Sequence, residues 1–238
     1  MPRSVVSRRR FLENTSWLGG GLMAGGSAWL TAGQKPSGGQ ETGEPQVSPT
    51  EDLMREHGLL ARALLIYDEV RSRLESGKDA PAQAVAGTAA LIRRFVEDYH
   101  EKLEEDYLFP RFEKARQLVD LVTVLRQQHQ AGRRLTSEIE RLAAPASLQT
   151  PAGRKQLVEP MRRFVHMYRP HKSREDTVLF PALHHLVSAK EFDALGDEFE
   201  DREQKLFGKN GFESMVGEVA KLEAIMGIGN LAAFTPRS

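Results

Sequence analysis

Residues 100–110 read HEKLEEDYLFP, and residues 171–181 repeat the pattern as HKSREDTVLFP. Both stretches fit H-x-x-x-E-[ED]-x-x-L-F-P, in which a glutamate follows a histidine by four residues. A lone histidine on an apolar seam precedes each copy, His57 by 43 residues and His129 by 42. Self-similarity of this kind indicates two copies of one helical hairpin.

The rest of the chain has the periodicity of amphipathic helices. From Thr50 onward, apolar residues recur at the spacing of one helix face. We expect four long helices, separated by turns near residues 76–81, just after Pro110 and at residues 145–151. Short connections between four helices favour an all-α fold, an antiparallel up-down-up-down four-helix bundle. One or two shorter helices are expected after it, around residues 189–206 and 212–225.

The positions of the turns predict where the histidines meet. In an antiparallel hairpin, two residues face each other when they lie equally far from the turn. The midpoint of His57 and His100 falls at residues 78–79, and that of His129 and His171 falls at residue 150, both inside predicted turns. The midpoint of the middle pair falls at residues 114–115, just after Pro110. All four imidazoles are therefore expected at one level of the core.

Two carboxylates accompany these histidines. His100 and Glu104 are four residues apart and share one helix face, as do His171 and Glu175. Burying such carboxylates is expensive, and a pair of cations about 3.5–4 Å apart would remove that cost. A nitrogen–oxygen donor set suits iron and manganese, and zinc less distinctively. The predicted metal ligands are His57, His100, Glu104, His129, His171 and Glu175.

This constellation resembles the hemerythrin-like, HHE cation-binding family over about residues 53–186. The resemblance implies a four-helix bundle around two iron ions in a non-haem centre, with Glu104 and Glu175 bridging the irons and the histidines as terminal ligands. The function expected is binding of dioxygen, peroxide or nitric oxide for sensing, storage or detoxification. The alternative is a di-iron oxidase or a catalase-like peroxidase, and a helical scaffold without metal is a third hypothesis.

The chain departs from oxygen-carrying hemerythrins at one position. Those proteins have a second histidine one turn after the first on the third helix, where this chain has Arg133, which is not a ligand. Their last carboxylate ligand follows its histidine by five residues, so Asp176 competes with Glu175, and the internal repeat favours Glu175. The missing histidine argues against reversible oxygen carriage and favours the enzyme. Other candidates for its place are Tyr168, Glu101 and Glu97.

The remaining histidines and acids are expected to play other roles. His166 lies about 140° around its helix from His171, and His184 and His185 follow Pro181, so none of the three is expected to bind metal. We expect Glu105 and Asp106 to be solvated or to orient the ligands. Arg133 is expected either to neutralise buried carboxylates or to reach solvent.

The N-terminus has the layout of an export signal. Residues 7–12 read SRRRFL, which resembles the twin-arginine signature, and a Gly-rich apolar stretch follows. The resemblance implies export of the folded protein to the periplasm. We expect a signal peptide over residues 1–33, a flexible linker over 34–49, the bundle over 50–188 and a C-terminal helical extension over 189–238.

Composition excludes several classes of function. The 238 residues include no cysteine, which excludes disulfides, thiolate zinc sites and iron–sulfur clusters. Basic and acidic residues balance at 33 each, and aromatic residues make up 7%. Neither value favours binding to nucleic acid or to an anionic membrane. The expected partner is a small-molecule ligand, and the membrane is involved only through export.

Overall fold

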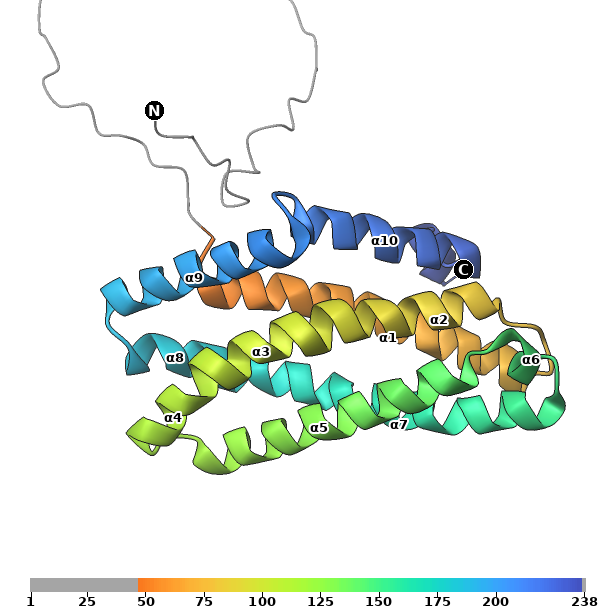
Figure 1. Ribbon diagram of the computed structural model, residues 1–238, viewed down its shortest axis with the longest axis horizontal. Helices are drawn as coiled ribbons and strands as arrows, with labels where there is room; N and C mark the ends of the chain where they lie inside the picture. The colour runs from red at the N-terminus through yellow and green to blue at the C-terminus, as the bar shows by residue number, and fades with distance from the viewer. Residues whose placement is uncertain (1–46, 237–238) are drawn as a thin grey trace, which may run out of the picture. The chain divides into compact units, whose positions relative to one another are not determined.

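Four helical rods carry the histidines in the computed structural model, which describes residues 47–236 (Figure 1). The first rod is α1 (Pro49–Glu75), and the third is α5 (Val119–Leu142). The second is a continuous run of α2 (Ala82–Leu91), η2 (Ile92–His100), α3 (Glu101–Leu103), η3 (Glu104–Leu108) and α4 (Phe109–Ala115). The fourth comprises α7 (Pro151–Arg174), η4 (Glu175–Leu179) and α8 (Phe180–Leu186), and the one-turn helix α6 (Pro145–Leu148) precedes it.

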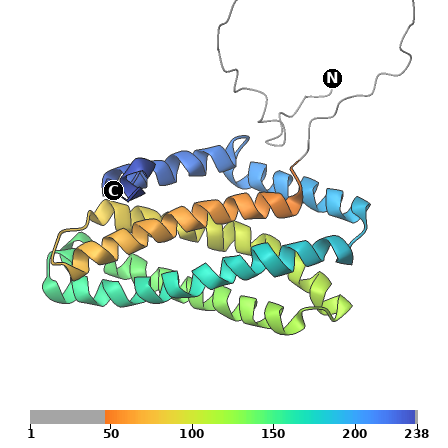
Figure 2. The same ribbon diagram turned by 180° about the vertical axis from the view of Figure 1, so that it is seen from behind.

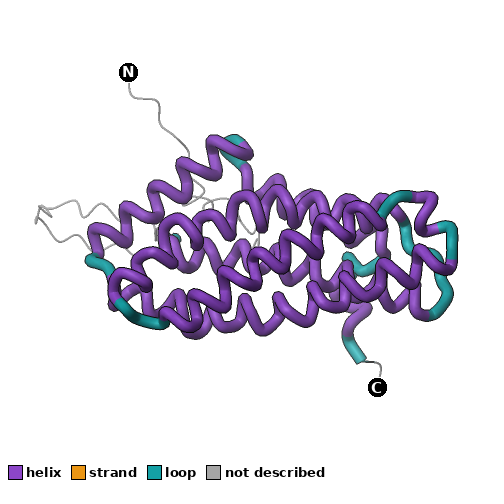
Figure 3. The backbone as a smooth tube through the Cα atoms, turned by 60° about the horizontal axis from the view of Figure 1, so that its bottom comes forward, coloured by secondary structure: helices purple, strands orange, loops and turns teal. Residues whose placement is uncertain are grey.

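The residues that the structure describes form helices and no strand, as Figure 3 shows, and the expectation of an all-helical fold is confirmed. The export signal expected over residues 1–33 lies outside the described residues, and so does the linker expected over 34–49, up to residue 46. No helix in the described part is long and apolar enough to cross a membrane.

Local sequence signals set the ends of α1. The side chain of Ser48 accepts a hydrogen bond from the backbone N–H of Glu51, and Pro49 occupies the first turn, where a missing N–H costs nothing. Glu51 and Asp52 place negative charge at the positive end of the helix dipole. The helix ends before Gly77, whose positive φ of 74° reverses the chain.

The rods pack side by side along their lengths. Figure 1 shows that consecutive rods run back and forth, and α1 and α5 both pack against α7. Figure 2 shows α1 beside the fourth rod from behind. Among the largest side chains that they bury completely are Tyr67, Phe95, Tyr99, Phe109, Phe164, Tyr168 and Phe180. This packing brings the inward face of each rod into one core.

Wide π-helical turns precede both prolines of the repeated motif. The N–H of Phe109 bonds to the carbonyl of Glu104, and the N–H of Phe180 to that of Glu175, five residues back in each case. Pro110 and Pro181 lack an N–H, and in an ordinary helix their rings would clash with the carbonyl four residues earlier. The wider turn relieves that clash and begins at each predicted glutamate ligand. Such π-bulges are frequent at functional sites.

Two further helices, α9 (Ala189–Phe207) and α10 (Gly211–Met226), follow close to their expected bounds, and a short 3₁₀ turn η5 (Leu231–Phe234) comes after them. A capping box between Ser188 and Glu191 starts α9. Both helices pack on α1, and α10 also packs on α2. The ring of Phe207 lies edge-on to Tyr99 at 5.4 Å. The extension therefore covers one side of the first two rods.

Candidate metal centre

The four seam histidines come from four different rods and meet in the core. The ring centroids of His57 and His100 lie 4.7 Å apart, and those of His129 and His171 lie 4.9 Å apart. The Nε2 atoms of His129 and His171 are separated by 3.2 Å. Each of the four side chains is at most 4% exposed. The structure therefore brings all four imidazoles to a common depth.

Glu104 and Glu175 lie between the histidine pairs. The Oε1 atom of Glu104 is 3.7 Å from Nε2 of His100, and its Oε2 atom is 3.4 Å from Nε2 of His129. The Oε2 atom of Glu175 is 3.1 Å from Nε2 of His171 and 3.4 Å from Nε2 of His57. Each carboxylate thus faces histidines of both halves of the repeat.

These donors form two adjacent groups. One ligand atom from each of His57, His100 and Glu104 lies within 4.8 Å of the other two, and the same holds for His129, His171 and Glu175. Neither glutamate is exposed, and none of their four carboxylate oxygens has a hydrogen-bond partner. Buried carboxylate oxygens without donors are costly unless a cation neutralises them. The donor set therefore fits a metal centre held by these six residues.

The two glutamates have opposite electrostatics. Burial raises the pKa of Glu104 well above its usual range, and repulsion from Glu175 raises it further. Burial alone would raise the pKa of Glu175 too, but His171 and His57 lower it well below its usual range. Without a cation, one carboxyl therefore holds a proton while the other stays ionised.

The histidine pKa values are also shifted. Burial lowers the pKa of His57, but the hydrogen bond to Asp176 and the nearby negative charge of Glu175 outweigh it and raise the value to about 9. For His129, burial dominates over the hydrogen bond that its Nδ1 donates to Glu105, and it lowers the pKa to about 4. The core therefore holds a mixture of protonated and neutral groups, and bound cations would displace the protons.

The residue before each lone histidine accepts a hydrogen bond from Nδ1 of the histidine on the next rod, and we call such an acceptor the support of that histidine. The Nδ1 atom of His100 donates to Oε2 of Glu56 at 2.8 Å, and that of His171 donates to Oε1 of Gln128, also at 2.8 Å. Glu56 immediately precedes His57, just as Gln128 immediately precedes His129. The sequence analysis did not single out either residue, although the repeat register places them at equivalent positions.

The residue after each glutamate supports the lone histidine of the other half. The Nδ1 atom of His57 donates to Oδ1 of Asp176 at 2.6 Å, and that of His129 donates to Oε1 of Glu105 at 3.1 Å. Partners of this kind fix the ring orientation and leave Nε2 directed at the centre. All four imidazoles are therefore held from behind by an oxygen acceptor.

A family model for the hemerythrin HHE cation-binding domain matches residues 48–183. The chain belongs to this family. The chain is also similar, over nearly its full length, to the uncharacterized proteins Mb2018 of Mycobacterium bovis and Rv1995 of Mycobacterium tuberculosis. Each is 42% identical over 239 residues, which cover 99% of this chain and 93% of the relative. No solved structure matches. The domain match ends inside α8, so α9 and α10 lie beyond it.

Within this HHE domain, the structure separates the two rival carboxylates of the fourth rod. The carboxylate of Glu175 faces the ring nitrogens and is fully buried, whereas the side chain of Asp176 is 26% exposed and lies behind His57. Asp176 therefore orients a predicted ligand and does not face the centre itself.

The place of the missing fifth histidine contains a buried polar cluster. The guanidinium of Arg133 lies 2.8 Å from Glu101 and 2.7 Å from Glu105, which matches its expected role as a partner for buried carboxylates. The hydroxyl of Tyr168 donates to Oε1 of Glu101 at 2.5 Å. Gly132 makes room for this phenol, because a Cβ there would lie 2.0 Å from the hydroxyl oxygen. The Tyr168 hydroxyl is thus engaged by a carboxylate.

The remaining candidates lie away from the two groups of donors. Glu97 accepts from Thr136 at 2.5 Å and pairs with Arg93. The three other histidines, none of which was expected to bind metal, are exposed: His166, His184 and His185.

Proposed function

We propose that this HHE domain is a non-haem di-iron protein that binds a small ligand, such as dioxygen, peroxide or nitric oxide, for sensing, storage or detoxification. In this proposal the four rods act as an antiparallel four-helix bundle around the centre. Glu104 and Glu175 would hold two iron ions together with the four histidines. The observation that carries the proposal is the set of four buried carboxylate oxygens without hydrogen-bond donors, which face four Nε2 atoms.

Membership of the HHE cation-binding family supports iron over the other candidates. Two carboxylates and four imidazoles suit both iron and manganese, and zinc less distinctively. When bound, such a centre supplies a Lewis acid that changes oxidation state and takes a small ligand. The chain itself holds the imidazoles through Nδ1 and excludes water from the carboxylates.

The test is ligand binding by iron-loaded protein. Small ligands should shift its ligand-to-metal charge-transfer bands, and the shift should be lost in His100→Ala and kept in His184→Ala, a control at an exposed histidine. Iron-loaded wild type with no spectral response to oxygen, peroxide or nitric oxide would contradict the proposal.

The alternative is a di-iron oxidase or catalase-like peroxidase. The observation that favours it is the acidic and phenolic cluster beside the centre, where Arg133 holds Glu101 and Glu105 and the hydroxyl of Tyr168 is bonded to Glu101. Oxygen release from peroxide that disappears in Glu104→Ala would decide for the enzyme. Spectral binding without turnover would decide for the ligand-binding protein.

The sequence also supports a proposal on localisation, namely export as a folded protein to the periplasm. Its support is the SRRRFL stretch at residues 7–12 ahead of a Gly-rich apolar run. Replacing Arg8, Arg9 and Arg10 by lysine should retain the protein in the cytoplasm, as cell fractionation would show. Unchanged distribution between the fractions would overturn the proposal.

A further inference from the structure

The two halves of the repeat differ at the support of one histidine. Behind His100, the carboxylate of Glu56 accepts from Nδ1 with one oxygen and from the Tyr99 hydroxyl with the other, at 3.2 Å. Behind His171, the corresponding residue is Gln128, and Pro170 stands where the first half has Tyr99. The amide of Gln128 therefore has no phenol beside it and carries no charge.

The two halves of the repeat also differ in whether another helix covers these supports, Glu56 and Gln128. Glu203 of α9 lies within 4.8 Å of both Asp52 and Glu56, and Phe207 packs on Tyr99. The C-terminal extension thus covers the surface between the first two rods at this level. A groove of about 610 Å³ remains between α9 and the second rod, and its lining includes Tyr99 but neither His100 nor Glu56.

The equivalent surface of the second half is open. A groove of about 370 Å³ lies between α5 and α7, and its lining includes Val124, Gln128, Pro170 and His171. Val124 precedes His129 by five residues, just as Asp52 precedes His57 by five. The α5–α7 groove is therefore the counterpart of the surface that α9 covers in the first half. Val124 is 47% exposed.

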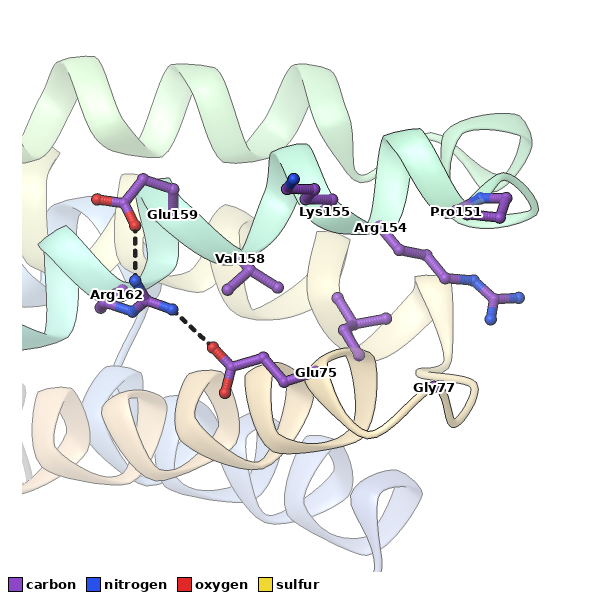
Figure 4. A pocket seen from close by; sticks show the side chains of 9 residues that line it. Glu75, Gly77, Pro151, Arg154, Lys155, Val158, Glu159 and Arg162 are labelled. Atoms are coloured by element: carbon purple, nitrogen blue, oxygen red, sulfur yellow. Dashed lines mark hydrogen bonds and ion pairs between the residues drawn. The ribbon is translucent and has the colours of Figure 1, made fainter.

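The side chain of His171 separates this groove from the centre. Its Nδ1 edge meets Gln128 in the groove, and its Nε2 atom lies 3.1 Å from Glu175 and 3.2 Å from Nε2 of His129. Three other grooves of the described chain are lined by none of the six predicted ligands. The larger one in Figure 4 lies where α1 ends and α7 begins, and there Arg162 is already paired with Glu75 and Glu159.

From these observations we infer that small ligands reach the centre through the α5–α7 groove, past Gln128, and bind on the side of His129 and His171. This inference rests on the proposed metal site. Asp120 and Arg174 place opposite charges at the rim, and Leu121 and Val124 supply an apolar wall. The groove therefore selects by size and not by the sign of charge.

The test uses full-length, iron-loaded protein and azide as the probe, followed by absorbance after rapid mixing. Val124→Trp fills the groove and should slow azide association about tenfold, which corresponds to about 1.4 kcal/mol of added barrier. Dissociation should slow by a similar factor, so the equilibrium affinity and the iron content stay unchanged. Leu65→Trp, at a 42% exposed position on α1, is the matched control and should associate at the wild-type rate.

Two more variants test the access route independently, in case Val124→Trp fails to fold. Leu121→Trp places similar bulk one turn earlier on α5 and should also slow association, whereas Gln128→Ala opens the groove and should speed it. Wild-type rates in both tryptophan variants, or equal slowing in Leu65→Trp, would overturn this access route. Failure of wild-type protein to take up iron would instead overturn the metal site on which the inference rests.

Discussion

Oδ1 of Asp176 lies 2.6 Å from Nδ1 of His57, so the fourth rod orients an imidazole on the first. Glu105 relates to His129 in the same way from the second rod to the third. The two halves of the repeat therefore interlock, because each supplies the acceptor that fixes the lone histidine of the other.

Replacing this acceptor should weaken metal binding without removing a ligand. We expect Asp176→Asn to lower iron affinity by about 10–100-fold, because the amide holds the ring but makes it a poorer base. Asp106→Asn is the matched control, since Asp106 pairs at the surface with Arg202. Competition with a chelator of known affinity measures the difference, and equal affinities in the two variants would refute the role of Asp176.

Chelator-treated protein should lose stability as the pH rises. Its His57 pKa is about 9 against an ordinary value of 6.5, so the folded state holds this proton more tightly than the unfolded state. That stabilisation, about 3 kcal/mol, is fully present below pH 6.5 and is lost as the pH rises through 9. The raised pKa of Glu104 acts in the same direction.

Urea unfolding of the chelated protein at pH 7, 8 and 9 measures this slope above the range in which His129 affects it, and Asp176→Asn should flatten it. Iron affinity should change in the opposite sense and increase with pH, because bound cations displace the same protons. Stability of the chelated protein that rises from pH 7 to 9 would contradict the assignment of these protons.

The phenol of Tyr168 should not bind iron. Burial and the neighbouring Glu101 raise the pKa of Tyr168 well above its usual range, so it remains a neutral donor to Glu101. Tyr168→Phe should cost about 1–3 kcal/mol of folding stability, because a buried carboxylate oxygen loses its donor. The visible spectrum of the iron protein should stay as in wild type. Loss of a phenolate-to-iron band would instead make Tyr168 a ligand.

Gly132 should be required for the packing of that phenol. A Cβ at Gly132 would lie 2.0 Å from the hydroxyl oxygen of Tyr168, so Gly132→Ala should destabilise the protein by about 1–3 kcal/mol. Gly58→Ala is the matched helical control, with no atom within 4 Å of the new methyl group, and should stabilise α1 by up to about 1 kcal/mol. Thermal unfolding of both variants checks the contrast in sign.

The depth of the histidines could be predicted from sequence because it depends only on where the turns fall. Lys78 and Asp79 do lie in the loop between α1 and α2, and Thr150 is the cap residue of α7. An antiparallel arrangement then fixes which residues face each other, whatever the details of packing.

The supports of the histidines could not be predicted in the same way. Glu56 lies about 100° around the helix from His57 and so falls off the apolar seam. Its contact with His100 depends on how two rods pack, which periodicity does not encode. The π turns that begin at Glu104 and Glu175 do not follow from the apolar seam either, because a constant helical period does not encode them. The sequence signal for them is the Leu-Phe-Pro that closes each copy of the motif.

The most direct test of the central claim is the iron content of purified, iron-loaded protein, measured per chain for wild type and for Glu104→Ala. Two carboxylates that each face both histidine pairs predict about two iron atoms per wild-type chain and a loss of the paired centre in the variant. Wild-type protein that holds no iron after loading, or a Glu104→Ala variant that holds two as tightly as wild type, would contradict the account.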